Sequence, residues 1–305
     1  MTPPSLVTLR ATELRRLIGI KEVSPVELLK ACIARIEALD PAVNAIAARA
    51  FERARTEARA AEAAVLNGAA LGRLHGLPIG IKDLQDTEGL LTTHGSPLYK
   101  DHVPAADSAQ VALVRAAGAI VTAKTNVPEF GAGANSRNSV WGATGNPFDP
   151  TLIAGGSSGG SAAALACDML PLCTGSDTGG SLRLPAAICG VVGFRPSPGL
   201  VPMNGRPLGW TPISVLGPMG RSVADARMLF AVQLGVDSRD PLSRALDPDS
   251  AAHVRPADLS RLKGRVDHRL RPVSGRRRDL RGDAPAHRRD AAPVPRRGRD
   301  CVRSG

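Results

Sequence analysis

Two glycine-rich stretches that contain serines lie close together in the sequence, at residues 155–161 (GGSSGGS) and 177–183 (DTGGSLR). A lone lysine, Lys82, follows an apolar run upstream of both. Because glycine has no side chain, the backbone of such a stretch can approach a reacting group and direct several N–H donors at one point. A serine inside such a turn is a candidate nucleophile with an oxyanion stabiliser beside it.

A serine hydroxyl is a weak nucleophile until a neighbouring group removes its proton. Lysine can do this only when it is neutral, which requires burial that lowers its pKa well below the ordinary value of about 10.4. The apolar run at residues 77–81 (LPIGI) favours burial of Lys82. Simpler interpretations stay open, because a lysine after a strand is usually solvated and a glycine-rich stretch also fits a loop or an anion site at a helix start.

Two other hydrolase patterns fit parts of the sequence less well. Residues 155–159 match the G-x-S-x-G turn of α/β-hydrolases, which needs an aspartate and then a histidine downstream. The downstream histidines lie at or beyond the edge of the patterned region: His253, His268 and His287. Residues 177–179 (DTG) resemble an aspartic-protease triplet, but the sequence has no second copy. Neither pattern accounts for Lys82.

Hydrophobic periodicity predicts an α/β architecture after a helical N-terminal segment. Ser24 followed by Pro25 and Glu27 is a strong helix start, and Asp40–Pro41 predicts its end. A second helix is expected at residues 51–66. Apolar runs then predict strands at 77–81, 119–123, 170–174 and 191–194, alternating with helices at 108–117, 161–167 and 222–234.

Composition is typical of a folded chain with an unusual end. Of the 305 residues, 43% are apolar and 22% are charged. Residues 264–305 contain 13 Arg and 5 Asp, so this segment holds +8 of the net charge of +11. We expect the segment to be disordered, and a nucleic-acid partner is not favoured because it lacks aromatic residues and any known motif.

The distribution of cysteines and the hydropathy of the sequence indicate the cellular compartment in which the protein is expected. The five cysteines are scattered and form no C-x-x-C pair, so free thiols in a reducing cytoplasm are expected, rather than disulfides or a metal site. No signal peptide and no apolar run of membrane-spanning length is recognised, so we expect a cytoplasmic protein with no membrane partner.

The glycine–serine stretches and the lysine together resemble the amidase signature family. The resemblance is carried by five blocks in family order, at residues 125–131, 142–147, 154–164, 177–186 and 217–225. It extends from about residue 24 to residue 263. It implies a mixed β-sheet core between layers of helices, preceded by the helical segment.

The resemblance also implies a catalytic triad. Ser181 is then the nucleophile that attacks an amide carbonyl, Ser157 is the bridging serine with a cis peptide bond, and Lys82 is the base. The backbone N–H groups expected to hold the oxyanion are those of Thr178, Gly179, Gly180 and Ser181. Three further residues are expected to contact the catalytic residues and not the substrate: Ser158, Asp177 and Arg183. For Asp177 and Arg183, roles in a turn or in packing are equally consistent with the sequence.

The expected function is hydrolysis of a carboxylic amide through an acyl-enzyme, with a small-molecule amide as substrate and no metal or organic cofactor. A protein like the A subunit of the glutamine-dependent amidotransferases, which acts on misacylated tRNA with partner subunits, is the alternative, and a homodimer is left open. Family members continue with a long patterned C-terminal region. We therefore hypothesise a truncated or frameshifted amidase, with a helical segment at 1–68, an incomplete catalytic core at 69–263 and the arginine-rich tail at 264–305.

Overall fold

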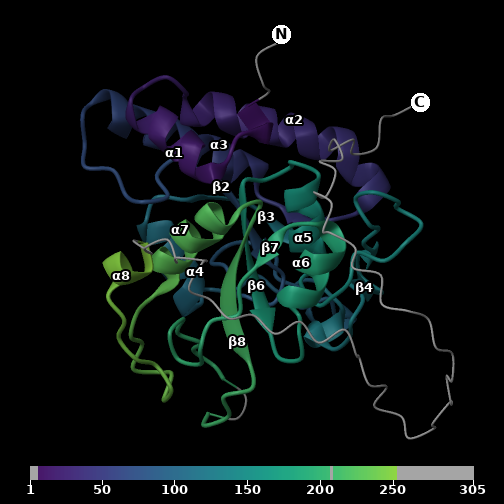
Figure 1. The fold of residues 1–305 in the computed structure, drawn as a ribbon. Helices are drawn as coiled ribbons and strands as arrows, with labels where there is room; N and C mark the ends of the chain where they lie inside the picture. Colours follow the sequence, from purple (N-terminus) through teal and green to yellow (C-terminus); the bar gives the residue numbers. More distant parts are fainter. Residues whose placement is uncertain (1–5, 207–208, 253–305) are drawn as a thin grey trace, which may run out of the picture. The chain divides into compact units, whose positions relative to one another are not determined.

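A six-stranded mixed β-sheet forms the centre of the computed structural model, which describes residues 6–206 and 209–252 (Figure 1). The strand order is β1-β3-β2-β6-β8-β7. The strands of this sheet are β1 (Ile46–Arg49), β2 (Pro78–Lys82), β3 (Ile120–Thr125), β6 (Leu172–Asp177), β7 (Val192–Gly193) and β8 (Val215–Gly220). A separate two-stranded sheet pairs β4 (Arg137–Asn138) with β5 (Gly142–Ala143).

The three central strands β3, β2 and β6 run parallel to one another, whereas β1, β8 and β7 each pair antiparallel with their neighbour. Every residue of β2, β3 and β8 is buried. Strands buried on both faces have continuous apolar sequences, which is the pattern that the sequence shows at residues 77–81. The expected mixed sheet between helices is confirmed.

Helices surround the sheet, and long segments connect β2 to α4 and β3 to α5 (Figure 1). They are α1 (Ala11–Gly19), α2 (Pro25–Val43), α3 (Phe51–Leu66), α4 (Ala109–Ala116), α5 (Gly159–Ala166), α6 (Arg183–Cys189), α7 (Val223–Gln233) and α8 (Pro248–Ala252). Short 3₁₀ turns occur at Leu6–Thr8, Pro97–Tyr99 and Glu129–Gly131. None of the helices in the described ranges is both long and apolar enough to cross a membrane.

Helix α2 starts as predicted but ends later than predicted. The Ser24 hydroxyl accepts hydrogen bonds from the N–H groups of Val26 and Glu27. The helix continues through Pro41 to Val43, so the predicted end at Asp40–Pro41 is wrong. The preference of a residue before proline for extended backbone is overcome here, because the buried Asp40 carboxylate accepts hydrogen bonds from two N–H groups just beyond the helix, those of Ala45 and Ile46.

Helix α5 lies deep in the core and fixes the position of the loop before it. All eight of its residues are buried, and it contacts β2, β3, β6 and β8. Glycine is required at Gly160, because a Cβ there would lie 2.3 Å from the backbone nitrogen of Asn126. The small side chains therefore let the start of α5 approach the sheet, where the candidate residues lie.

The N-terminal helices share a core with the sheet. Leu14 of α1 and Leu28 of α2 belong to the same buried cluster as Ile79 and Ile81 of β2. The described residues all fall within one compact unit. The whole tail expected to be disordered, residues 264–305, lies outside the described residues, as does the last part of the predicted catalytic core, residues 253–263.

Candidate active site

Strands β2 and β6 end next to each other at one edge of the sheet. Lys82 is the last residue of β2, and Ser176 and Asp177 are the last two residues of β6. Because β2 and β6 are parallel neighbours, their carboxyl ends meet at the same edge, which is where sites form in such sheets. The loop before α5 places Ser157 and Ser158 at this edge as well.

The Lys82 amine lies among three serine hydroxyls. Its Nζ atom donates hydrogen bonds to the Oγ atoms of Ser157 at 2.7 Å, Ser158 at 2.9 Å and Ser176 at 2.9 Å. The side chain is fully buried. Burial lowers the pKa of Lys82 to about 7, although the nearby negative charge of Asp177 acts in the opposite direction. Near neutral pH the amine therefore exists in both its charged and its neutral form.

Ser157 connects the buried lysine to a cavity. The peptide bond between Gly156 and Ser157 is cis. The carbonyl of Ser157 accepts a hydrogen bond of 3.3 Å from the Ser136 hydroxyl, which holds the loop in place. Ser157, Ser176 and Thr178 all line a cavity of about 580 Å³. A molecule in this cavity can therefore approach the hydroxyl that contacts Lys82.

Ser181 lies on the turn after β6, beside the loop that carries Ser157. The carbonyl of Ser181 accepts a hydrogen bond of 3.2 Å from the Ser158 N–H, so the two glycine–serine stretches are joined through their backbones. Among the residues that the structure describes, the Ser181 hydroxyl makes no hydrogen bond. The structure thus brings Lys82 and Ser157 into direct contact. Ser181 is joined to the Ser157 loop through its backbone carbonyl and is not among the residues that line the cavity.

The backbone donors predicted for an oxyanion differ in their availability. The Gly180 N–H donates a hydrogen bond of 2.9 Å to Asp177 Oδ1, so this donor is occupied. The N–H groups of Thr178, Gly179 and Ser181 have no acceptor within the described part of the chain. Three of the four predicted donors therefore have no acceptor among the described residues, and of these three residues Thr178 lines the cavity.

Asp177 organises the turn that carries Ser181. Its buried carboxylate accepts two hydrogen bonds from Arg183, each 3.0 Å long, and a third from Arg195. It also accepts hydrogen bonds from the N–H groups of Gly180 and Leu182. Burial alone would raise the pKa of Asp177, but Arg183 and these N–H donors outweigh it and hold the pKa well below its usual range. The Asp177 carboxylate therefore holds the 178–182 turn through two of its backbone N–H groups, those of Gly180 and Leu182.

Replacing Asp177 by asparagine is expected to lower the free energy of unfolding by about 2 kcal/mol, because hydrogen bonds to a charged group are lost. The measurement is urea denaturation at neutral pH. Asp149→Asn is the matched control, since Asp149 is a surface residue that caps only its own turn through Thr151. Equal stabilities of Asp177→Asn and the parent would show that this carboxylate does not hold the turn.

A family model described as Amidase matches residues 27–265, which is most of the chain. The chain belongs to the amidase signature family. Curated relatives agree with this assignment. The A subunit of glutamyl-tRNA(Gln) amidotransferase from Acidothermus cellulolyticus is 42% identical over 259 residues, which cover 85% of this chain and 51% of that protein.

Solved structures of amidase signature proteins have the same fold. A bacterial aryl acylamidase of this family superposes with a TM-score of 0.75 at 36% identity, over 78% of this chain and 50% of the other. The A subunit of glutamyl-tRNA(Gln) amidotransferase from Thermotoga maritima superposes with a TM-score of 0.69 at 32% identity, over 81% and 51%. The chain thus spans about half the length of the amidase signature relatives that it matches.

Sequence reasoning missed two polar residues at this amidase signature site. Ser176 contacts the Lys82 amine, and its place two residues after the strand predicted at 170–174 could have indicated this, since β6 continues to Asp177. Gln85 lines the cavity, and its Nε2 atom is buried without a hydrogen-bond partner among the described residues. Gln85 follows Lys82 by three residues, and no pattern in the sequence indicates its role.

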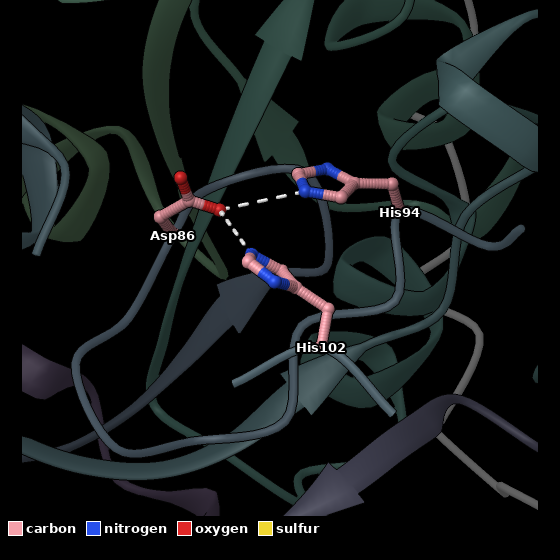
Figure 2. A group of neighbouring side chains, drawn as sticks. All are labelled: Asp86, His94 and His102. Atoms are coloured by element: carbon pink, nitrogen blue, oxygen red, sulfur yellow. Dashed lines mark ion pairs between the residues drawn. The ribbon is translucent and has the colours of Figure 1, made fainter. Parts of the chain in front are cut away.

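One group of side chains in the described residues has the donor atoms to hold a metal ion, namely Asp86, His94 and His102 (Figure 2). The sequence analysis did not identify this group. Asp86 and His94 line the same cavity as Ser157.

Proposed function

We propose that this chain hydrolyses carboxylic amides through Lys82, Ser157 and Ser181. The observation that carries the proposal is the 2.7 Å contact between the buried Lys82 amine, whose pKa is lowered to about 7, and the Ser157 hydroxyl at the cavity wall. A neutral amine in hydrogen-bond contact with a hydroxyl is the arrangement that general-base catalysis requires.

In the proposed reaction, neutral Lys82 takes a proton from Ser157 as Ser157 takes one from Ser181. The Ser181 Oγ atom then attacks the amide carbon, and the carbonyl oxygen becomes an oxyanion. The free N–H groups of Thr178, Gly179 and Ser181 are the proposed donors to this oxyanion. Collapse of the intermediate releases the amine, which receives the proton back from Lys82 through Ser157. The acyl group stays on Ser181 until water hydrolyses the ester.

The three N–H donors support this assignment because they lie on the turn that carries the nucleophile. Loss of one such donor typically costs about 3 kcal/mol in the activation barrier. Asp177 keeps the turn in place without contacting the reacting atoms, so we assign it a positioning role. The proposed steps require no metal ion and no organic cofactor.

A second candidate function is glutamine hydrolysis within an amidotransferase. It is supported by the relatives that are A subunits of glutamyl-tRNA(Gln) amidotransferase, of which the Acidothermus cellulolyticus protein is 42% identical. Both functions use the same nucleophile and the same acyl-enzyme step. They differ in the amide that is cleaved and in the need for partner subunits.

Ammonia release from simple aliphatic and aryl amides and from glutamine separates the two candidates. We expect release from simple amides, abolished in Ser181→Ala and retained in Ser161→Ala. Ser161 is a suitable control because its buried hydroxyl is hydrogen bonded to Thr125 and to the Thr174 carbonyl, not to Lys82. Release from glutamine alone favours the amidotransferase, and release from neither class contradicts both proposals.

A further inference from the structure

Three side chains from the segment between β2 and α4 converge at the cavity, although no step proposed above uses them. Asp86, His94 and His102 are each partly exposed. Figure 2 shows both imidazole rings directed at the same carboxylate oxygen of Asp86. The Nε2 atom of His94 lies 3.4 Å from Asp86 Oδ1, and that of His102 lies 4.0 Å from it.

These contacts leave the carboxylate oxygen without a hydrogen bond of good geometry. Asp86 Oδ1 is shielded from solvent, yet it accepts no hydrogen bond from the described residues. Three donor atoms, one from each side chain, lie within 4.8 Å of one another. In a tetrahedral zinc site with bonds of about 2.1 Å, neighbouring ligand atoms are about 3.4 Å apart. The Asp86–His94 pair therefore already has the separation that a shared ion requires.

The surrounding structure holds the two imidazole rings close together. The Tyr99 ring packs edge-on against His94 with 5.0 Å between centroids, and against His102 with 5.4 Å. The His102 carbonyl accepts a hydrogen bond from the Thr92 N–H, and the His94 carbonyl accepts one from the Phe130 N–H. These contacts bring together two histidines that are eight residues apart in the sequence. The rings are thus oriented before any ion binds.

We propose that Asp86, His94 and His102 bind a divalent transition-metal ion, of which zinc is the representative. Two imidazoles and one carboxylate suit zinc, cobalt and nickel, whereas magnesium and calcium prefer oxygen ligands alone. Three protein ligands leave a fourth position for water or for another ligand. Because Asp86 and His94 also line the cavity that contains Ser157, the ion lies where it can contact a molecule bound there.

The test is titration of the full chain with Zn²⁺ by calorimetry and with Co²⁺ by its visible absorption, after removal of metals with a chelator. We expect one ion to bind at this cluster, while Mg²⁺ does not bind. His102→Gln is the most informative variant, since His102 does not line the cavity. This variant should weaken Zn²⁺ binding at least tenfold, because mutation of a residue that only hydrogen bonds to a metal ligand already lowers the metal affinity by about 10- to 100-fold.

Histidines elsewhere supply the controls. His75→Gln removes an imidazole whose Nε2 atom lies 2.9 Å from the Ala61 carbonyl oxygen, so it should leave metal binding unchanged. A variant with glutamine at the three histidines outside the described residues should also keep the ion: His253, His268 and His287.

Absence of Zn²⁺ binding by the parent, unchanged binding in both His94→Gln and His102→Gln, or binding lost only with the three outer histidines would overturn the proposal. Without metal, His102→Gln should still react at Ser181, so failure of the metal site and failure of the catalytic proposal are distinguishable.

Discussion

Alanine at Ser181 is expected to abolish covalent labelling of this chain by a fluorophosphonate probe. Such probes phosphonylate an activated serine, and the proposed relay delivers a base to one hydroxyl, that of Ser181. Removal of a catalytic serine lowers enzyme turnover by a factor of about 10⁶ in the best-studied case, so no labelled band should remain. The measurement is labelling of purified protein followed by mass spectrometry of the modified peptide.

The controls for this experiment separate the nucleophile from the serines around it. Ser157→Ala should retain slow labelling at Ser181, because it breaks the relay and keeps the nucleophile. Ser161→Ala should label at the parental rate, since its hydroxyl contacts Thr125 and the Thr174 carbonyl. A modified Ser157 or Ser158 in the Ser181→Ala protein would assign the nucleophile to a different residue.

Replacing Lys82 by methionine is expected to slow labelling and amide hydrolysis by about 10²- to 10⁴-fold, the usual contribution of a general base. Methionine fills a similar volume and removes the amine that contacts three serine hydroxyls. Thermal unfolding of the variant, followed by circular dichroism, checks that the fold is retained.

Lys124→Met is the matched control for Lys82→Met. Lys124 is also fully buried, and burial lowers its pKa to about 8, with the charge of Asp83 acting in the opposite direction. Its amine donates hydrogen bonds to the Gln85 carbonyl and to the Thr87 hydroxyl, not to the candidate serines. We expect a much smaller effect on labelling than that of Lys82→Met. Equal losses in both variants would mean that removal of any buried lysine disturbs this site.

The sequence predicted the elements that have strong local signals. The Ser24 cap and the run at residues 77–81 correspond to the start of α2 and to β2. Strand β8 was missed because Gly217, Pro218 and Gly220 are typical of a turn. In the fold these residues form a buried strand between β6 and β7. A Cβ at Gly217 would lie 2.5 Å from the Phe194 carbonyl oxygen, so its glycine reflects close packing, not a turn.

At the candidate site, too, the sequence predicted what neighbouring residues determine and missed the contacts that depend on the fold. The apolar run before Lys82 correctly predicted its burial, because the local sequence determines that strand. Contacts between Lys82 and Ser176, which are 94 residues apart, depend on how β2 and β6 pair. Asp86, His94 and His102 lie between the strand predicted at 77–81 and the helix predicted at 108–117, where the sequence predicts no regular element. Their convergence depends on a folded loop, which the sequence does not reveal.

The central claim is that a neutral Lys82 amine activates Ser181 through Ser157. The most direct test is the rate of fluorophosphonate labelling between about pH 5 and pH 9. A lysine whose pKa is lowered to about 7 loses its proton in this range, so the rate should rise with a midpoint near pH 7. In Lys82→Met the rise should disappear. A flat profile in the parent, or the same rise in Lys82→Met, would contradict the proposed role of Lys82.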